Sequence, residues 1–340
     1  MIQNFERYSR QVFFSGIGEE GQIRISRSTI LIVGCGALGS NMANLLVRAG
    51  VGTTKIVDRD FVELSNLQRQ VLFDEADAEK RLPKAVAAAE KLKQINGDIR
   101  VEAIIDDVNP RNIETMLAGV DLVLDATDNM ETRYLVNDAC VKHQIPWIYG
   151  GVIGATGMTM DIIPGKSACL RCLSDAPPAP GSMPTCETEG VLGGTPAVIA
   201  SIQATEALKI MVGHHPTGGN LIHIDLWENE YNRFQVNQHP DCPACVGKRF
   251  DFLEGELASE AFSLCGRNAV QITASREDQL DLKQLKARLL SLGEVADNDF
   301  FLTFKVDQYE LIIFPEARAI IKGTSDETVA RSLFAKYVGN

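Results

Sequence analysis

The chain has 340 residues, of which 45% are hydrophobic and 23% are charged, and its formal net charge is −12. This acidic balance disfavours binding to nucleic acid and to anionic membranes, and no uninterrupted apolar run is long enough to predict a transmembrane helix. The N-terminal sequence MIQNFERYSR lacks the apolar core of a signal peptide, so we expect a cytoplasmic protein. In that compartment the eight cysteines are expected to be thiols or metal ligands.

Strand-like and helix-like segments alternate along most of the chain. The expected strands are 26–33, 54–58, 99–105, 121–126, 147–150, 158–163, 221–226 and 233–236. The expected helices are 37–49, 84–95, 112–118, 131–143 and 195–212, with a Pro- and Gly-rich loop at 175–194. This alternation predicts an α/β fold with a doubly wound, Rossmann-like, mostly parallel sheet.

The composition becomes more charged after residue 247, and we expect a domain boundary near residue 250. Residues 1–250 would form the first domain and residues 251–340 a small α+β domain. The expected elements of the second domain are a strand at 270–273, a helix at 280–290, three strands within 299–322 and a helix at 326–337. No motif that carries chemistry is evident in this second domain.

A glycine-rich turn follows the first expected strand. Gly34, Gly36 and Gly39 have the spacing G-x-G-x-x-G, and Asp58 ends the next strand. Such glycines permit a tight turn and close approach of the backbone to a phosphate at a helix N-terminus, and the acidic residue suits a ribose. The pattern is typical of a dinucleotide site and predicts NAD when it is taken alone. The alternative is a glycine-dense turn that serves packing only.

Cationic residues change the nucleotide that this turn is expected to bind. Arg69 follows Asp58 closely, and Lys84 begins a helix, where a positive charge opposes the helix dipole. Additional cations suit a triphosphate with a departing pyrophosphate. Asp128, at the end of a buried strand, could hold Mg²⁺ together with the phosphates. Each residue alone could be a surface charge or a cap, but together they favour ATP over NAD.

Two Cys-x-x-Cys pairs stand far apart in the chain. Cys169 and Cys172 form the first pair, and Cys242 and Cys245 form the second. Four thiolates with this spacing predict a closed, structural zinc site, against the alternatives of a redox pair or disulfides.

Cys186 lies in the Pro- and Gly-rich loop, just before an expected helix. A helix N-terminus can lower the pKa of a thiol and make it a better nucleophile, whereas the plainer interpretation is a bystander thiol.

Several strings of this sequence resemble the ThiF/MoeB/HesA family, the bacterial relatives of ubiquitin-activating enzymes. They are RYSRQ at 7–11, VGCGALG at 33–39, DRDFVELSNLQRQ at 58–70, PK at 83–84, DATDN at 125–129, TCETEGV at 185–191 and the two Cys-x-x-Cys pairs. The resemblance covers about residues 5–248, and its motifs stand in the order of the family.

The resemblance implies ATP-dependent adenylation of the C-terminal glycine of a ubiquitin-like sulfur-carrier protein, ThiS- or MoaD-like and ending in Gly-Gly. A sulfur donor, a persulfide-bearing protein, would then displace AMP and give a thiocarboxylate. The residues that the resemblance places around ATP and Mg²⁺ are Gly34, Gly36, Ala37, Gly39, Asp58, Asp60, Ser65, Asn66, Leu67, Gln68, Arg69, Lys84, Asp128 and Asn129.

The resemblance also assigns two further catalytic residues. Arg10 matches the arginine that family members insert into the neighbouring subunit's site, which implies a homodimer. Cys186 matches a cysteine that joins covalently to the carrier in some members. The catalytic set would thus be Arg10, Arg69, Lys84, Asp128 and Cys186.

The sequence departs from the family at two places. Ala37 stands where relatives often have a second adjacent glycine, and about 90 residues follow the second Cys-x-x-Cys pair. A rhodanese extension would need an active-site cysteine loop, for which residues 265–267 are a poor candidate. An NAD-dependent oxidoreductase and a non-catalytic scaffold of the same fold stay open as alternatives. Thiamine, molybdopterin and tRNA-thiolation pathways use this chemistry, and the string TCETEGVLG at 185–193 favours a ThiS-like carrier.

Overall fold

The computed structural model describes residues 5–178, 188–214, 219–255, 261–264, 268–273, 280–298, 300–315 and 317–339. The chain divides into two compact units, Met1–Ala258 and Ser259–Asn340. This division falls later than the expected boundary near residue 250, because Phe250, Phe252 and Leu253 are buried in a core of the first unit. No helix among the described residues is long and apolar enough to cross a membrane.

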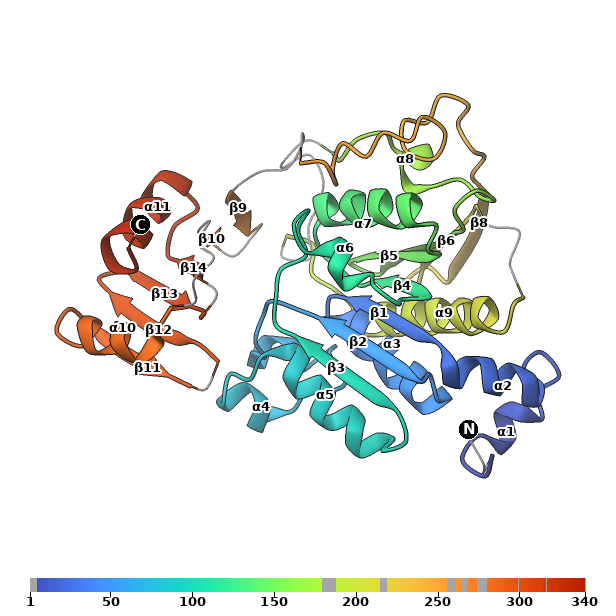
Figure 1. Cartoon of the computed structure of the whole chain (residues 1–340), viewed down its shortest axis with the longest axis horizontal. Coiled ribbons are helices and arrows are strands. Elements are labelled where there is room, and N and C mark those ends of the chain that lie inside the picture. The colour runs from blue at the N-terminus through green and yellow to red at the C-terminus, as the bar shows by residue number, and fades with distance from the viewer. Residues whose placement is uncertain are drawn as a thin grey trace. The chain divides into compact units, whose positions relative to one another are not determined.

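The first unit is built on an eight-stranded sheet with the order β3-β2-β1-β4-β5-β6-β7-β8 (Figure 1). The parallel strands are β1 (Thr29–Val33), β2 (Thr53–Val57), β3 (Arg100–Ile104), β4 (Leu122–Asp125) and β5 (Trp147–Ile153). The antiparallel strands that extend this sheet are β6 (Thr156–Ile162), β7 (Asn220–Asp225) and β8 (Glu230–Gln235). The expected mostly parallel, doubly wound sheet is therefore confirmed.

Helices cover both faces of this sheet, as Figure 1 shows. The helices α3 (Ala37–Ala49), α5 (Lys84–Ile95) and α9 (Gly194–Met211) belong to one core, and α6 (Ile113–Met116) and α7 (Met130–His143) belong to the other. Successive residues of β1 alternate between the two cores, with Ile30 and Ile32 in the first and Leu31 and Val33 in the second. A strand that is buried on both faces consists of consecutive apolar residues, and this run made β1 predictable from the sequence.

Several short helices were not foreseen. The 3₁₀ turn η1 (Leu64–Asn66) lies within 61–73, where the sequence predicts a loop or a short helix, whereas the helices that were not foreseen are α1 (Ser9–Val12), α2 (Gly18–Arg27), α4 (Glu75–Glu79) and α8 (Leu170–Leu173). Most of them span a single turn, so they are too short for a hydrophobic period to develop. The longer helices α3 and α5 begin and end where the sequence predicts.

The second unit contains a six-stranded antiparallel sheet with the order β11-β12-β13-β14-β10-β9. Its strands are β9 (Ala261–Leu264), β10 (Ala269–Thr273), β11 (Glu294–Asp297), β12 (Leu302–Val306), β13 (Tyr309–Ile313) and β14 (Arg318–Lys322). The helices α10 (Leu282–Leu289) and α11 (Glu327–Tyr337) supply Leu285, Leu289 and Phe334 to one core with Phe304 and Leu311 of the sheet. The expected α+β unit is confirmed.

Candidate functional site

The candidate site lies where three neighbouring parallel strands end. The glycine turn follows β1, Asp58 follows β2, and the segment 126–129 follows β4. The carboxyl ends of parallel strands meet at one edge of the sheet, and ligands of open α/β sheets bind at that edge.

Two glycines of the turn are required by the backbone around them. Gly34 has φ +93°, and a Cβ there would lie 2.6 Å from the Ala126 carbonyl oxygen. A Cβ on Gly39 would lie 2.0 Å from the Gly34 carbonyl oxygen, so the start of α3 packs directly on the turn. Gly36 differs, because a Cβ there would meet only Gln70 Nε2, at 3.8 Å. The space before the N-terminus of α3 is therefore open, as phosphate binding requires.

Asp58 joins the end of β2 to the glycine turn. Its Oδ2 accepts a hydrogen bond from the Cys35 N–H at 2.6 Å, and its Oδ1 accepts from the Asp60 N–H at 2.7 Å. Burial raises the pKa of Asp58, and the positive charge of Lys84 opposes this rise. Each carboxylate oxygen can accept a second hydrogen bond, so Asp58 can still receive a ribose hydroxyl.

Lys84 is buried at the first position of α5, with 4% of its surface exposed. Its Nζ lies 3.2 Å from Asp60 Oδ2, and its backbone N–H donates to the Asp60 carbonyl oxygen at 2.9 Å. A buried ammonium at a helix N-terminus is unfavourable for stability, because it opposes the helix dipole and loses its water. The carboxylate of Asp60 compensates for this cost and fixes the direction of the lysine.

The segment after β4 is held by an ion pair that the sequence did not reveal. Asp125 is fully buried, and its Oδ2 lies 3.1 Å from Arg133 Nε of α7. Asp125 Oδ1 accepts from the backbone N–H and the hydroxyl of Thr127, each at 2.9 Å. Arg133 Nη2 donates to the carbonyl oxygens of Thr127 at 2.6 Å and Gly150 at 3.0 Å. The acidic Asp125 within an apolar strand was a signal for a buried, paired carboxylate, but the sequence does not identify Arg133 as its partner.

Asp128 and Asn129, which follow in the chain, differ in exposure and in hydrogen bonding. Asp128 is exposed, so its carboxylate can meet a metal ion or a phosphate-bound metal from solvent. Asn129 Oδ1 accepts from the Glu131 N–H at 2.8 Å and thereby caps the N-terminus of α7. The side-chain oxygen of Asn129 is thus already used by the fold.

The loop 64–70 brings further polar groups towards the glycine turn. Asn66 is buried, and its Oδ1 accepts from the Glu63 N–H at 3.0 Å, which shapes the 3₁₀ turn η1. Arg69 Nη1 donates to the Ser65 carbonyl oxygen at 2.8 Å. A Cβ on Gly193 would lie 3.0 Å from the Gln68 carbonyl oxygen, so this loop also borders the start of α9. Leu67 packs at the margin of the core shared with α3.

Gln70 is a site residue that sequence reasoning did not select. It is 4% exposed, its amide faces Gly36, and none of the residues that the structure describes donates a hydrogen bond to its Oε1. A buried polar atom without a partner is uncommon and suits a position that a ligand completes.

The described part of the structure does not join Arg10 to this edge of the sheet. Arg10 lies on α1 and is exposed, and no hydrogen bond or ion pair joins it to the site residues described above. Cys186 lies outside the described residues.

The four Cys-x-x-Cys sulfurs converge although the pairs are distant in sequence. The Sγ atoms of Cys169, Cys172, Cys242 and Cys245 all lie within 4.8 Å of one another. Cys169 and Cys242 are 3.6 Å apart at Sγ, and Cys172 and Cys245 are 3.5 Å apart. A tetrahedron with Zn–S bonds of about 2.3 Å has edges of about 3.8 Å, so the set fits zinc.

Two polar groups accompany this cysteine cluster. The His239 N–H donates to Cys172 Sγ at 3.4 Å, and Gln238 Nε2 donates to Cys245 Sγ at 3.3 Å. These donors stabilise negative charge on sulfur, as a metal–thiolate site requires.

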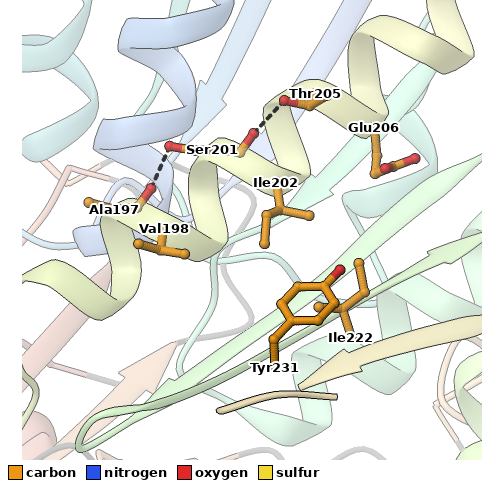
Figure 2. Close-up of a pocket in the computed structure, with 8 residues that line it drawn as sticks. All are labelled: Ala197, Val198, Ser201, Ile202, Thr205, Glu206, Ile222 and Tyr231. Atoms are coloured by element: carbon orange, nitrogen blue, oxygen red, sulfur yellow. Dashed lines mark hydrogen bonds between the residues drawn. The ribbon is translucent and has the colours of Figure 1, made fainter. Parts of the chain in front are cut away.

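A groove of about 530 Å³ lies apart from these residues, along α9 and the strands β7 and β8 (Figure 2). The hydroxyls of Ser201 and Thr205 donate to carbonyl oxygens within α9, at 2.7 and 2.8 Å. Figure 2 shows Ile202 directed towards Tyr231, so the groove presents mainly apolar surface. It contains none of the predicted nucleotide-binding residues.

The fold and the strand-edge site define an α/β protein whose glycine turn is accompanied by a buried lysine and acidic groups. Residues 8–244 match the ThiF family. The chain therefore belongs to the ThiF family.

Two curated relatives are similar over most of their length. The "Sulfur carrier protein ThiS adenylyltransferase" of Bacillus subtilis (strain 168) is 42% identical over 338 residues, which cover 98% of this chain and 99% of the relative. The "Sulfur carrier protein adenylyltransferase" of Thermus thermophilus is 39% identical and covers 72% of this chain and 91% of the relative. Among solved structures, E. coli MccB with MccA-N7isoASN has a TM-score of 0.62 at 23% identity, covering 72% of this chain and 75% of that one, which supports the fold alone.

Proposed function

We propose that this protein is an adenylyltransferase that uses ATP to activate the C-terminal glycine of a ubiquitin-like sulfur-carrier protein. The observation that carries the proposal is the strand-edge site, where an open phosphate turn adjoins the Lys84–Asp60 pair and the exposed Asp128. The family and the name of the Bacillus subtilis relative, which covers nearly the whole chain, support the same activity. They favour it over an NAD-dependent oxidoreductase and over a scaffold without activity.

The chemistry follows from where charge develops. A carrier carboxylate oxygen bonds to the α-phosphorus of ATP, the bond from that phosphorus to the bridging oxygen breaks, and pyrophosphate leaves with the electron pair. The attacking group is already an anion at neutral pH, so no protein base is needed. Arg69, Lys84 and the N-terminus of α3 stabilise the phosphate charges and orient the attack. Asp128 would hold Mg²⁺, which supplies further charge neutralisation on the phosphates.

The proposed nucleotide contacts separate into those to the ribose and those to the phosphates. Asp58 would bind the ribose hydroxyls, and Gly34, Gly36, Ala37 and Gly39 would allow close backbone approach. The remaining members of the set that we assign to the nucleotide are Asp60, Ser65, Asn66, Leu67, Gln68 and Asn129. Asn66 and Asn129 contribute through the shape of their loops, since their side-chain oxygens already cap backbone N–H groups.

A homodimer is part of the proposal. Arg10 is exposed and stands just before Phe13 and Phe14, whose surfaces are 76% and 63% exposed. Two adjacent exposed aromatic rings suit an interface better than contact with water. We assign Arg10 to the phosphates of a second copy of the chain, where its charge would assist pyrophosphate departure.

We assign the steps after adenylation from the resemblance to the family. The outer sulfur of a persulfide-bearing donor would bond to the carrier's carbonyl carbon as AMP leaves, which gives an acyl disulfide between carrier and donor. A thiol would then attack the donor's sulfur, so that the S–S bond breaks, the carrier thiocarboxylate leaves and a disulfide forms on the donor. Cys186 is our candidate for a covalent link in this step. The name of the Bacillus subtilis relative favours a ThiS-like carrier, and hence thiamine synthesis in the cytoplasm, over a MoaD-like carrier.

Zinc bound by Cys169, Cys172, Cys242 and Cys245 is proposed as a structural ion. It would join the segment after β6 to the segment after β8, and catalysis would not use it. Metal analysis should find about one zinc per chain, and Cys242→Ser should lower both the zinc content and the melting temperature. Rapid alkylation of Cys169 and Cys242 in the native protein would contradict the assignment.

Exchange of labelled pyrophosphate into ATP tests the adenylation itself. Exchange should require a carrier that ends in glycine and should fall at least about a hundredfold in Asp128→Ala, since a metal ligand at the phosphates is lost. Exchange that is undiminished in Asp128→Ala would refute the site. Nicotinamide binding without ATP binding would instead select the oxidoreductase.

A further inference from the structure

Tyr8 attaches the segment that carries Arg10 to the body of the first unit. Tyr8 is 4% exposed, and its hydroxyl accepts a hydrogen bond of 2.8 Å from Asn96 Nδ2. Its ring lies against Gly50, where a Cβ would stand 2.6 Å from Tyr8 Cε1. Asn96 is fully buried and also donates to the Val47 carbonyl oxygen at 2.8 Å. Tyr8 thus contacts the caps that end both α3 and α5.

Other side chains of the same segment bind the same two helix ends. Arg7 Nη1 donates to the Ile95 carbonyl oxygen at 3.1 Å. Gln11 Nε2 donates to the Ala49 carbonyl oxygen at 2.9 Å, and Gln22 Nε2 reaches that oxygen at 3.0 Å. The last carbonyl groups of a helix lack partners within it, and these bonds satisfy the final carbonyl of each of the two helices.

The opposite ends of these two helices begin at the nucleotide site. The first residue of α3 is Ala37, in the glycine turn, and the first residue of α5 is Lys84. Arg10 stands between the anchors Tyr8 and Gln11 and is itself exposed. Fixing the backbone on both sides of a long, mobile side chain reduces the conformations that must be lost when it binds.

We propose that Tyr8 and Asn96 are positioning residues that hold α1 in the orientation from which Arg10 enters the site of a second copy of this chain. This inference rests on the proposed function. The Tyr8–Asn96 bond defines where the ring, and hence the helix after it, must lie. Tyr8→Phe removes this bond and keeps the ring.

Mixed dimers separate positioning of Arg10 from general stability. Two full-length chains with different tags, Arg10→Ala and Asp128→Ala, are co-expressed and purified through both tags. Each mixed dimer then has one competent site, served by the Arg10 of the Asp128→Ala chain. Tyr8→Phe is placed on one chain or on the other, and pyrophosphate exchange is measured at saturating ATP and carrier. Tyr134→Phe is the matched control, since Tyr134 is also buried and its hydroxyl donates to the carbonyl oxygens of Ser174 and Ala176.

We expect exchange to fall about fivefold when Tyr8→Phe lies on the chain that supplies Arg10, and to change little when it lies on the chain that supplies the site. Tyr134→Phe should act equally on either chain. Equal losses from Tyr8→Phe on both chains would overturn the positioning role while leaving adenylation intact. A mixed dimer without Tyr8→Phe that regains no activity, beside an active wild type, would refute the assignment of Arg10 to the second copy. No exchange by the wild type with any carrier would refute the proposed function itself.

Discussion

The strand-edge site of the first unit buries charged side chains, whereas the core of the second unit consists mainly of apolar side chains. The edge buries charged groups, including Asp125, Lys84 and Arg133, which are 0%, 4% and 8% exposed. The core beneath α10 and α11 is formed by apolar side chains such as Phe304 and Leu311. Burial of charge costs free energy unless the charges are paired, whereas burial of apolar surface is favourable. The strand edge therefore depends on the pairing of its buried charges, whereas the core of the second unit depends mainly on the burial of apolar surface, although that unit also buries Arg318, which is 1% exposed.

Lys84→Met should give the largest effect, because it removes a buried cation and leaves Asp60 without its partner at Nζ. Pyrophosphate exchange should fall about a hundredfold to a thousandfold, as when a preorganised electrostatic group is lost. Lys55→Met in β2 is the matched control, since Lys55 Nζ donates to the Ala118 carbonyl oxygen at 2.9 Å, away from the glycine turn. Equal losses in the two variants would remove the distinction between a site lysine and a structural one.

Phe304→Ala tests the other side of the comparison. Phe304 is fully buried and packs on Tyr337 with ring centroids 5.0 Å apart. Its truncation should lower the free energy of unfolding of the second unit by about 3 to 5 kcal/mol. Exchange activity at a temperature where this unit stays folded should remain within about twofold. A loss of exchange comparable to that of Lys84→Met would show that the second unit takes part in adenylation.

Asp161→Asn should have the smallest effect of these variants. It measures how much a buried charge lowers the free energy of unfolding at a position that belongs to neither region. Burial, and then the neighbouring charge of Glu206, raise the pKa of Asp161 from 3.8 to about 8. The folded chain therefore binds a proton that the unfolded chain releases, and stability is lost as the pH rises from about 4 to about 8. The variant should be more stable by about 1 to 2 kcal/mol at pH 8.5, with a gain that vanishes near pH 4. Thermal melts across this range measure it, and a gain independent of pH would contradict the cause.

The sequence predicted what depends on neighbouring residues and missed what depends on distant ones. The glycine turn, Asp58 and the bounds of α3 and α5 follow from spacing and hydrophobic period, and the Cys-x-x-Cys pairs carry their own signal. Three features were not predicted, because each depends on how elements pack in three dimensions. They are the Arg133–Asp125 pair, the buried Gln70 Oε1 and the Tyr8–Asn96 bond. Tyr8 and Asn96 stand 88 positions apart, and no local pattern relates them.

The C-terminal boundary shows the same limit in another form. A shift to charged composition suggested a domain change near residue 250, but Phe252 packs on Tyr134 with ring centroids 5.0 Å apart. Its N–H also donates to Asp138 Oδ2 at 3.1 Å. Composition averages over a window, whereas a few anchoring side chains decide to which unit a segment belongs.

Intact-mass analysis of the carrier tests directly whether this protein adenylates a ubiquitin-like sulfur carrier. The protein is mixed with ATP, Mg²⁺ and a ThiS-like carrier in the absence of a sulfur donor, and the reaction is stopped with acid. The mass of the carrier should increase by one adenylyl group at the C-terminal glycine, and pyrophosphate should be released. A carrier of unchanged mass, beside a positive control with a known adenylyltransferase of this family, would contradict this activity.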